Sequence, residues 1–183
     1  MRHGQAERDT AVDQERRLDG PGRAEALAAG RWLAGFGVVP ELARVSGARR
    51  TRETWDCVGA ALARLPEVVH EQGLYDLSVE IHRRAAPLGE LVTLLRETPE
   101  EVGELLVVGH NPSLPELVAF LLGTAGGELS RRVADSGFPT ASVAVLEFDG
   151  SWQDLGPGAT RITAFWTPTP IARPGGSAGP GAG

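Results

Sequence analysis

Hydrophobic and polar positions along this chain switch between helical and extended spacing, and the switches predict the order of its secondary structure. Apolar residues recur every three to four positions between Arg23 and Phe36, and Gly37 then ends the run. Residues 73–78 are expected to be a loop. The same criteria predict further helices over residues 50–65, 79–97 and 113–122, and short strands over residues 42–46, 68–70, 105–108, 141–148 and 161–166.

The order of these elements predicts a layered α/β fold. Strands and helices alternate over most of the chain and a β-rich segment follows, as in folds whose helices cover a central sheet. The run Leu105-Leu106-Val107-Val108 is continuously apolar, which is typical of a strand covered on both faces in a parallel or mixed sheet. Residues 1–170 are therefore predicted to form one domain. Residues 171–183, rich in glycine, proline and alanine, are predicted to be a disordered tail.

Composition and charge narrow the classes of function. The 183 residues suffice for one hydrophobic core, and 42% hydrophobic with 23% charged residues is usual for a globular protein. A net charge of −6 argues against a broad basic surface for nucleic acid or anionic membranes. The single cysteine excludes an internal disulfide, and no apolar run reaches bilayer length. We expect a cytoplasmic monomer that binds neither nucleic acid nor membranes.

Two histidines stand where predicted strands give way to loops. His3 lies in Arg2-His3-Gly4, and His110 follows the apolar run in Gly109-His110-Asn111-Pro112. Between them, residues 46–54 (SGARRTRET) place three arginines at the start of a predicted helix. Two imidazoles and several guanidinium groups that converge on one point would bind an anion, and a phosphoryl group suits them best.

Each of these residue types has a role in phosphoryl transfer. A neutral imidazole is a good nucleophile near neutral pH, so His3 is the predicted acceptor of the phosphoryl group, and activity should fall in acid as His3 takes up a proton. Arg2 and Arg50 offer paired donors to phosphate oxygens, and a protonated His110 would add another. The Asp76 carboxylate is the candidate proton donor to the leaving group, and a loop-capping role explains it equally well.

Four ordered segments resemble those of one family. Arg2-His3-Gly4 resembles the RHG signature of the histidine phosphatase superfamily, also called the phosphoglycerate mutase-like family. Residues 16–22 (RRLDGPG) are similar to its R-x-L-T-x-x-G segment, and residues 46–54 to its S-x-x-x-R-A-x-Q-T segment. Residues 108–112 (VGHNP) resemble the V-G-H-N-P segment of short members, the SixA-type phosphohistidine phosphatases. The resemblance covers roughly residues 1–167.

The resemblance implies a fold and a set of roles. It implies a three-layer α/β/α sandwich with a mixed, mostly parallel central sheet, no metal and no cofactor, and transfer through a phosphohistidine on His3. Arg2, Arg50 and His110 take the family's phosphate-binding positions. Asp76 falls near the position where the family often carries its acid.

The chain departs from the family at its first residues. Family members carry an apolar strand immediately before RHG, whereas here Met1 precedes Arg2, so the resemblance implies a sheet that lacks its first strand. Two explanations are open: a translation start placed too far downstream, which we favour, or true loss of the strand. Losing a central strand removes ladder hydrogen bonds and apolar contacts. We therefore expect the chain as written to be less stable and poorly active, and an added upstream apolar strand to raise both melting temperature and activity.

Three functions are compatible with these residues. The leading hypothesis is a metal-independent phosphatase that hydrolyses phosphohistidine or small phosphate monoesters. A phosphoglycerate mutase-like phosphotransferase is disfavoured, because the chain between Asp76 and His110 leaves little room for the insertions that enclose a bisphosphate. A non-catalytic phosphate-binding module is favoured if the missing strand is real. A compact chain with few loops predicts an open site that suits a phosphorylated protein.

Overall fold

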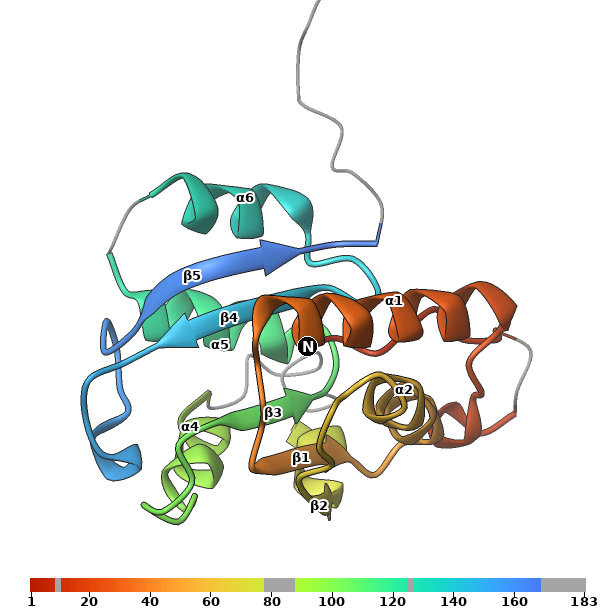
Figure 1. Cartoon of the computed structure of the whole chain (residues 1–183), viewed down its shortest axis with the longest axis horizontal. Helices are drawn as coiled ribbons and strands as arrows, with labels where there is room; N and C mark the ends of the chain where they lie inside the picture. Colours follow the sequence, from red (N-terminus) through yellow and green to blue (C-terminus); the bar gives the residue numbers. More distant parts are fainter. Residues whose placement is uncertain (9–10, 78–87, 125–126, 169–183) are drawn as a thin grey trace, which may run out of the picture.

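The part of the chain that the structure describes forms five short strands and the helices that pack on them (Figure 1). The computed structural model describes residues 1–8, 11–77, 88–124 and 127–168. The strands are β1 (Leu42–Ser46), β2 (Glu67–Glu71), β3 (Leu105–Val108), β4 (Val143–Glu147) and β5 (Arg161–Trp166). The helices are α1 (Gly20–Phe36), α2 (Arg49–Gly59), α4 (Leu88–Arg96), α5 (Ser113–Leu122) and α6 (Glu128–Ser136), with the short 3-10 helices η1 (Asp13–Glu15) and η2 (Trp152–Asp154). Residues 72–77 are also helical.

The strands form two sheets. β1 lies between β2 and β3 and is parallel to both, with Val45 opposite His70 on one side and Val108 on the other. β4 and β5 form a separate antiparallel pair. Three of the five strands are therefore parallel, which confirms the predicted mixed, mostly parallel arrangement.

Helices cover the parallel sheet on both faces, as expected for a sandwich of three layers. One core cluster joins Ala29 and Leu33 of α1 and Val58 of α2 to Val45 of β1 and Val108 of β3. On the opposite face, alternate β3 residues pack against a second cluster formed by residues 72–77, α4 and α5. All five β1 residues are buried, because this strand is central and covered on both sides.

The first three residues lie between the two sheets, where Figure 1 shows the amino terminus in the middle of the molecule. The Gly109 amide donates to the Met1 carbonyl at 3.0 Å, and the His3 amide donates to the Gly109 carbonyl at 3.1 Å. On the other side, the Arg2 amide donates to the Ser142 carbonyl at 2.9 Å. Because one segment bonds to both sheets, the gap between β3 and β4 is one strand wide at this end.

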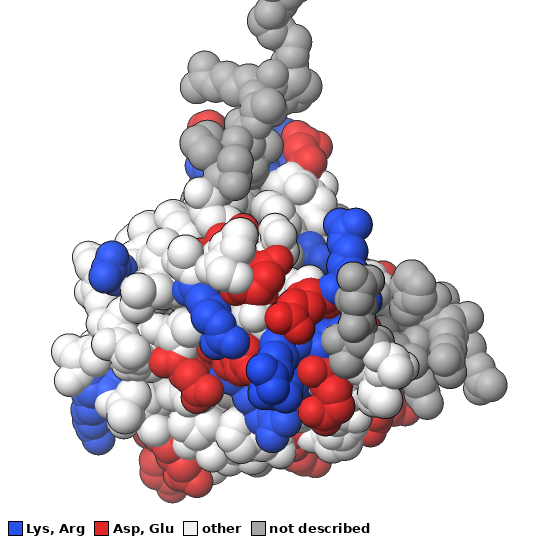
Figure 2. Space-filling model, turned by 90° about the vertical axis from the view of Figure 1, so that its right-hand side faces the viewer, with Lys and Arg blue, Asp and Glu red and all other residues white. Residues whose placement is uncertain are grey.

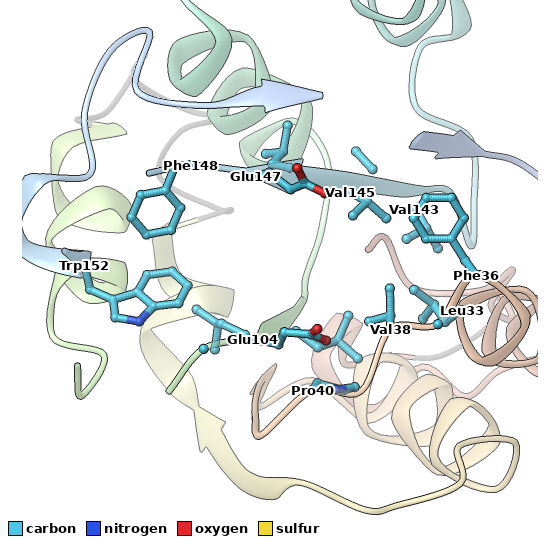
Figure 3. Close-up of a pocket in the computed structure, with 16 residues that line it drawn as sticks. Leu33, Phe36, Val38, Pro40, Glu104, Val143, Val145, Glu147, Phe148 and Trp152 are labelled. Carbon is cyan, nitrogen blue, oxygen red and sulfur yellow. The ribbon is translucent and has the colours of Figure 1, made fainter. Parts of the chain in front are cut away.

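Beyond Met1, the gap between β3 and β4 is an open slot lined mainly by apolar side chains, with Glu104 and Glu147 also in its lining (Figure 3). Its larger cavity, of about 440 Å³, lies on the α1 side, and Figure 3 shows Val145 on one wall, Val38 on the other, and Phe148 and Trp152 at one end. A smaller cavity of about 150 Å³ lies on the α5 side and reaches Met1. Among the residues that the structure describes, no strand pairs with these edges of β3 and β4. The lack of a first strand stays a prediction from the family resemblance.

Most predicted elements are confirmed, and the exceptions have physical reasons. The predicted loop over residues 73–78 is wrong where the structure describes it, since residues 72–77 form a helix that buries Leu74 and Leu77. α2 ends at Gly59, before the predicted end at residue 65. α6 was not predicted because it buries only Val133 and so has no apolar stripe.

Part of the prediction lies outside the described residues. The predicted helix over residues 79–97 is described only from Leu88 onward, and the predicted tail over residues 171–183 is not described. Within the ranges given above, no helix is both long enough and apolar enough to cross a bilayer.

Candidate active site

His3 is held at the end of the strand-like amino-terminal segment with its ring in a fixed orientation. The ring Nδ1 lies 2.7 Å from the Gly4 carbonyl oxygen. A carbonyl only accepts, so Nδ1 carries the proton and the neutral ring presents an unprotonated Nε2. Nε2 makes no hydrogen bond to any residue of the described ranges. The ring thus presents an unprotonated nitrogen, and the role of His3 as nucleophile stays a prediction.

Close backbone packing fixes the loop that follows His3. The Gly4 amide donates to the Thr54 hydroxyl at 3.0 Å, which links this loop to α2. A Cβ atom at Gly4 would lie 2.5 Å from the Gly22 carbonyl oxygen, and one at Gly22 would lie 1.9 Å from the Gln5 carbonyl oxygen. Both positions therefore require glycine, because any side chain would push α1 away from the loop.

His110 lies beside His3 at the carboxyl end of β3. The two ring centroids are 5.2 Å apart, and the His110 Nε2 lies 2.7 Å from the Ser46 hydroxyl at the end of β1. His110 Nδ1 is buried and has no hydrogen-bond partner among the described residues. When the Ser46 hydroxyl donates to Nε2, Nδ1 carries the proton of the neutral ring and donates to a bound anion.

Burial keeps both imidazoles neutral. It lowers the pKa of His3 to about 3, against a partial rise from the Gly4 hydrogen bond, and the nearby charge of Arg50 lowers it further. Burial, together with the neighbouring His3 and Arg50, lowers the pKa of His110 to about 2. At neutral pH His110 therefore offers a neutral N–H and not a protonated ring.

These shifts also move the expected effect of acid. A His3 pKa of about 3 leaves the nucleophile unprotonated well below the ordinary value of 6.5, so acid inactivation should begin at a lower pH than expected for free imidazole. The unfolded chain binds more protons than the folded chain between these two values. Stability therefore falls as the pH drops through this window, and His110 acts in the same direction.

Two arginines lie near the histidines. Arg50, in the first turn of α2, is buried, and its two terminal nitrogens donate to the main-chain and carboxylate oxygens of Asp13 at 2.8 and 3.0 Å. Arg2 donates to the Phe138 carbonyl at 2.8 Å. Both arginines lower the pKa of His3, which shows that their charges reach the ring. Their Nε atoms have no partner among the described residues.

The loop that receives Arg2 carries local backbone strain. Phe138 has a φ of 48° and Ala141 a φ of 56°, in the left-handed region that favours glycine. The Phe138 carbonyl accepts from Arg2, and the Ala141 amide donates to the His3 carbonyl at 2.9 Å. The strained residues therefore supply the contacts that fix the Arg2-His3 segment.

Asp13 and Tyr75 also belong to the site, although the sequence did not single them out, and so does Arg16, which lies in the R-x-L-T-x-x-G-like segment but was given no role. The Asp13 carboxylate accepts from Arg16 and from the Tyr75 hydroxyl, each at 3.0 Å. The Tyr75 ring lies edge-on to His110 with centroids 5.7 Å apart, and the Arg50 guanidinium carbon lies 5.8 Å from the Tyr75 ring centre. Partial burial raises the pKa of Asp13, but the Arg16 hydrogen bond and the Arg50 charge outweigh it and hold the pKa below its usual value.

Asp76 is not brought together with the other predicted residues. Its exposed carboxylate accepts from Gln72 at 3.1 Å and borders a separate surface pocket with Leu77 and Glu90. Its charge is not among those that shift the pKa of either histidine. The structure thus gathers Arg2, His3, Arg50 and His110, and the acid role of Asp76 stays a prediction.

Charges of both signs surround the site. Figure 2 faces the edge of the molecule where β1 and β3 end, and it shows basic side chains next to acidic ones. Arg23 and Arg49 both pair with Glu53, at 2.8 and 3.0 Å, as Arg50 pairs with Asp13 at 3.0 Å. Among the described residues, no group of three or more histidine, cysteine, aspartate or glutamate side chains is arranged to hold a metal ion.

Known proteins are similar to this chain over most of its length. Comparison with models of known families gives no match. An uncharacterised protein of Mycobacterium tuberculosis strain H37Rv, Rv1276c, is 31% identical over 172 residues, which cover 92% of this chain and 99% of that relative. A protein of Nakamurella multipartitia assigned as the phosphohistidine phosphatase SixA has a solved structure with a TM-score of 0.73 and 26% identity, covering 92% of this chain and 93% of that one. The structure of the protein histidine phosphatase SixA with tungstate has a TM-score of 0.70 and 26% identity, covering 92% and 94%.

The fold and the paired histidines define a class of protein built for phosphoryl transfer. These similarities, together with the placement of Arg2-His3-Gly4, Arg50 and His110, identify the family. The chain belongs to the histidine phosphatase superfamily, on its SixA branch.

Proposed function

We propose that this chain is a phosphatase that hydrolyses phosphohistidine or small phosphate monoesters through a phosphohistidine on His3. The observation that carries the proposal is the geometry of His3: Nδ1 faces the Gly4 carbonyl at 2.7 Å, and Nε2 has no partner in the described part of the chain. The solved relatives are phosphatases, one of them a protein histidine phosphatase, which supports the same reaction class.

The reaction takes place in two transfers. In the first, the His3 Nε2 lone pair forms a P–N bond while the bond from phosphorus to the leaving group breaks, and the leaving group departs with that electron pair. In the second, water attacks phosphorus, the P–N bond breaks, and its electrons return to Nε2. Inorganic phosphate is released, the proton lost by water passes to phosphate or solvent, and His3 is neutral again.

The arginines and His110 stabilise the phosphoryl oxygens in both transfers. Arg2 and Arg50 remain charged and supply planar donors, so they bind the ground state and the transition state. His110 Nδ1, buried without a partner among the described residues, adds a neutral donor. Because these groups are largely buried, water screens their interaction with phosphate weakly.

The choice of substrate class follows from the carboxylates near His3. Asp13 is ionised, because Arg16 and Arg50 lower its pKa, and the exposed Asp76 carboxylate accepts from Gln72. Among the described residues, no protonated carboxylic acid contacts the histidines, which favours substrates whose leaving group needs little protonation, such as phosphohistidine and aryl phosphates. Hydrolysis of a single sugar phosphate to the exclusion of these substrates would refute this assignment.

The test is hydrolysis of an aryl phosphate in the presence of EDTA. We expect turnover that resists chelation and that His3→Ala lowers on the order of a thousandfold or more, as expected for loss of a nucleophile. His70→Ala is the matched control, because His70 is an exposed β2 residue, and it should leave turnover unchanged. Phosphate binding without turnover would instead favour a non-catalytic binding module.

A further inference from the structure

Asp13 is the carboxylate that engages the anion-binding side chains next to His3. Its Oδ2 accepts from Arg50 and from the Tyr75 hydroxyl, both at 3.0 Å, and its Oδ1 accepts from Arg16 at 3.0 Å. The Asp13 main-chain carbonyl accepts from the other terminal nitrogen of Arg50 at 2.8 Å. Both terminal nitrogens of this arginine therefore face Asp13 and not an open anion site.

The two partners of this ion pair differ in how firmly they are held. The Arg50 side chain is 7% exposed and begins in the first turn of α2, whereas the Asp13 side chain is 52% exposed. The short helix η1 (Asp13–Glu15) buries none of its residues and has no side-chain cap at its start. Exposed segments with few buried contacts open at low free-energy cost. Asp13 is thus the partner that can move, and Arg50 is the fixed one.

The groups on Asp13 are those that a phosphoryl group would use. Two guanidinium groups and a phenol donate to its oxygens, and guanidinium groups bind carboxylate and phosphate in the same planar way. A phosphoryl group that binds the terminal nitrogens of Arg50 must take the place of the Asp13 oxygens. It must also approach while the Asp13 negative charge is still nearby, which raises the cost of binding.

We propose that Asp13 is an internal anion that occupies Arg50 in the resting site and is displaced when a phosphoryl group binds. The proposal rests on the proposed function, because it assumes that Arg50 binds the substrate phosphoryl group. Asp13 then sets the affinity of the site for phosphate: it keeps Arg50 paired when no substrate is bound and competes with weakly bound anions.

The test is the affinity for inorganic phosphate, measured by titration calorimetry on the full chain and on Asp13→Asn. The substitution removes the charge and keeps the shape, so we expect the Kd for phosphate to fall about threefold, the effect of losing one partly exposed ion pair. Glu15→Gln is the matched control: it removes the same charge from the same short helix at an exposed position, and it should leave Kd unchanged. Asp13→Ala should lower Kd in the same direction as Asp13→Asn.

The outcomes separate this proposal from the proposed function. A Kd that is unchanged or raised in both Asp13 variants would overturn the internal anion, and a raised Kd would make Asp13 a residue that positions Arg50. If the parent chain still binds phosphate in either of these cases, the proposed function is not overturned. If the parent chain binds no phosphate at all, both the proposed function and the internal anion are overturned. With an aryl phosphate, the expected signature in Asp13→Asn is a lower KM without a higher kcat.

Discussion

The two ends of the gap between β3 and β4 are built in opposite ways. At the site end, residues 1–3 bond to Gly109 on one side and to Ser142 on the other, and the His3 ring is oriented by Gly4. At the other end, the same strands face a slot of about 440 Å³ that is lined mainly by apolar side chains, and no strand lies between them among the described residues (Figure 3). One end positions the residues of the candidate site, and the other leaves these sheet edges unpaired among the described residues.

The amino group of Met1 lies between these two ends, and we call this point the seam. Met1 is 6% exposed, and its amino group donates to the Val107 carbonyl at 2.8 Å. Burial lowers the pKa of this amino group to about 5. The contacts that fix His3 lie on the site side of this seam. We therefore expect changes at the site end to alter activity and changes in the slot to alter stability.

The largest expected effect is at the site end, in Arg50→Lys. Lysine keeps the positive charge but loses the planar pair of donors, so kcat/KM should fall about a hundredfold. Arg49→Lys is the matched control, because the neighbouring guanidinium pairs with Glu53 and not with Asp13. Steady-state hydrolysis of an aryl phosphate measures both. Equal losses of kcat/KM in the two variants would show that Arg50 has no special role in the site.

The next effect is at the slot end, in an engineered extension of five apolar β-branched residues before Met1. Such a strand would run parallel to β3, pair with both edges, and bury side chains against α1 and α5. After the cost of ordering these residues, a gain of about 2 kcal/mol is expected. This corresponds to a rise in melting temperature of about 4 to 8 °C.

A glycine–serine extension of the same length is the control for this experiment. It provides the same backbone without apolar side chains, and it should raise the melting temperature little. Turnover per folded molecule should change less than stability, since His3 is bonded on the site side of the seam. Equal melting temperatures for the two extensions would show that the slot does not accept an apolar strand.

The smallest effect is at the seam, where acetylation of Met1 should remove one pH dependence. The amino group has a pKa of about 5 in the folded chain against 8.0 ordinarily, so the unfolded chain binds more protons between these values and stability rises with pH. From about pH 6.5 to pH 8, the gain should be about 1 to 2 kcal/mol in the free chain and absent in the acetylated chain. The urea midpoints of the free and acetylated chains at these two pH values measure this gain in stability. An equal change in midpoint for the two chains would contradict a buried amine.

Elements of the fold with strong local signals could be predicted from the sequence. The β1, α5 and β5 bounds match because each is an apolar run or stripe bounded by turn residues. The sequence suggested a missing strand but not the slot itself, because the shape of the slot depends on the distance between β3 and β4. α6 and the helix at residues 72–77 were missed, because tertiary contacts at Val133 and Leu74 stabilise them more than any regular pattern does.

The site divides in the same way. Arg2, His3, Arg50 and His110 lie in compact motifs that resemble those of the family, and the resemblance selects Arg50 among three neighbouring arginines. Asp13 and Tyr75 lie outside those motifs and reach the site through η1 and the helix at residues 72–77, where local sequence gives no signal. Asp76 neighbours Tyr75 in sequence, yet the helix directs Tyr75 toward His110 and leaves Asp76 bonded to Gln72.

The most direct measurement is mass spectrometry of the chain mixed with an aryl phosphate and quenched in alkali, where phosphohistidine survives. We expect a phosphoryl group on the peptide that contains His3, none on the peptide that contains His110, and no label in His3→Ala. A phosphoryl group on His110, or turnover without any phosphorylated peptide, would contradict His3 as the acceptor.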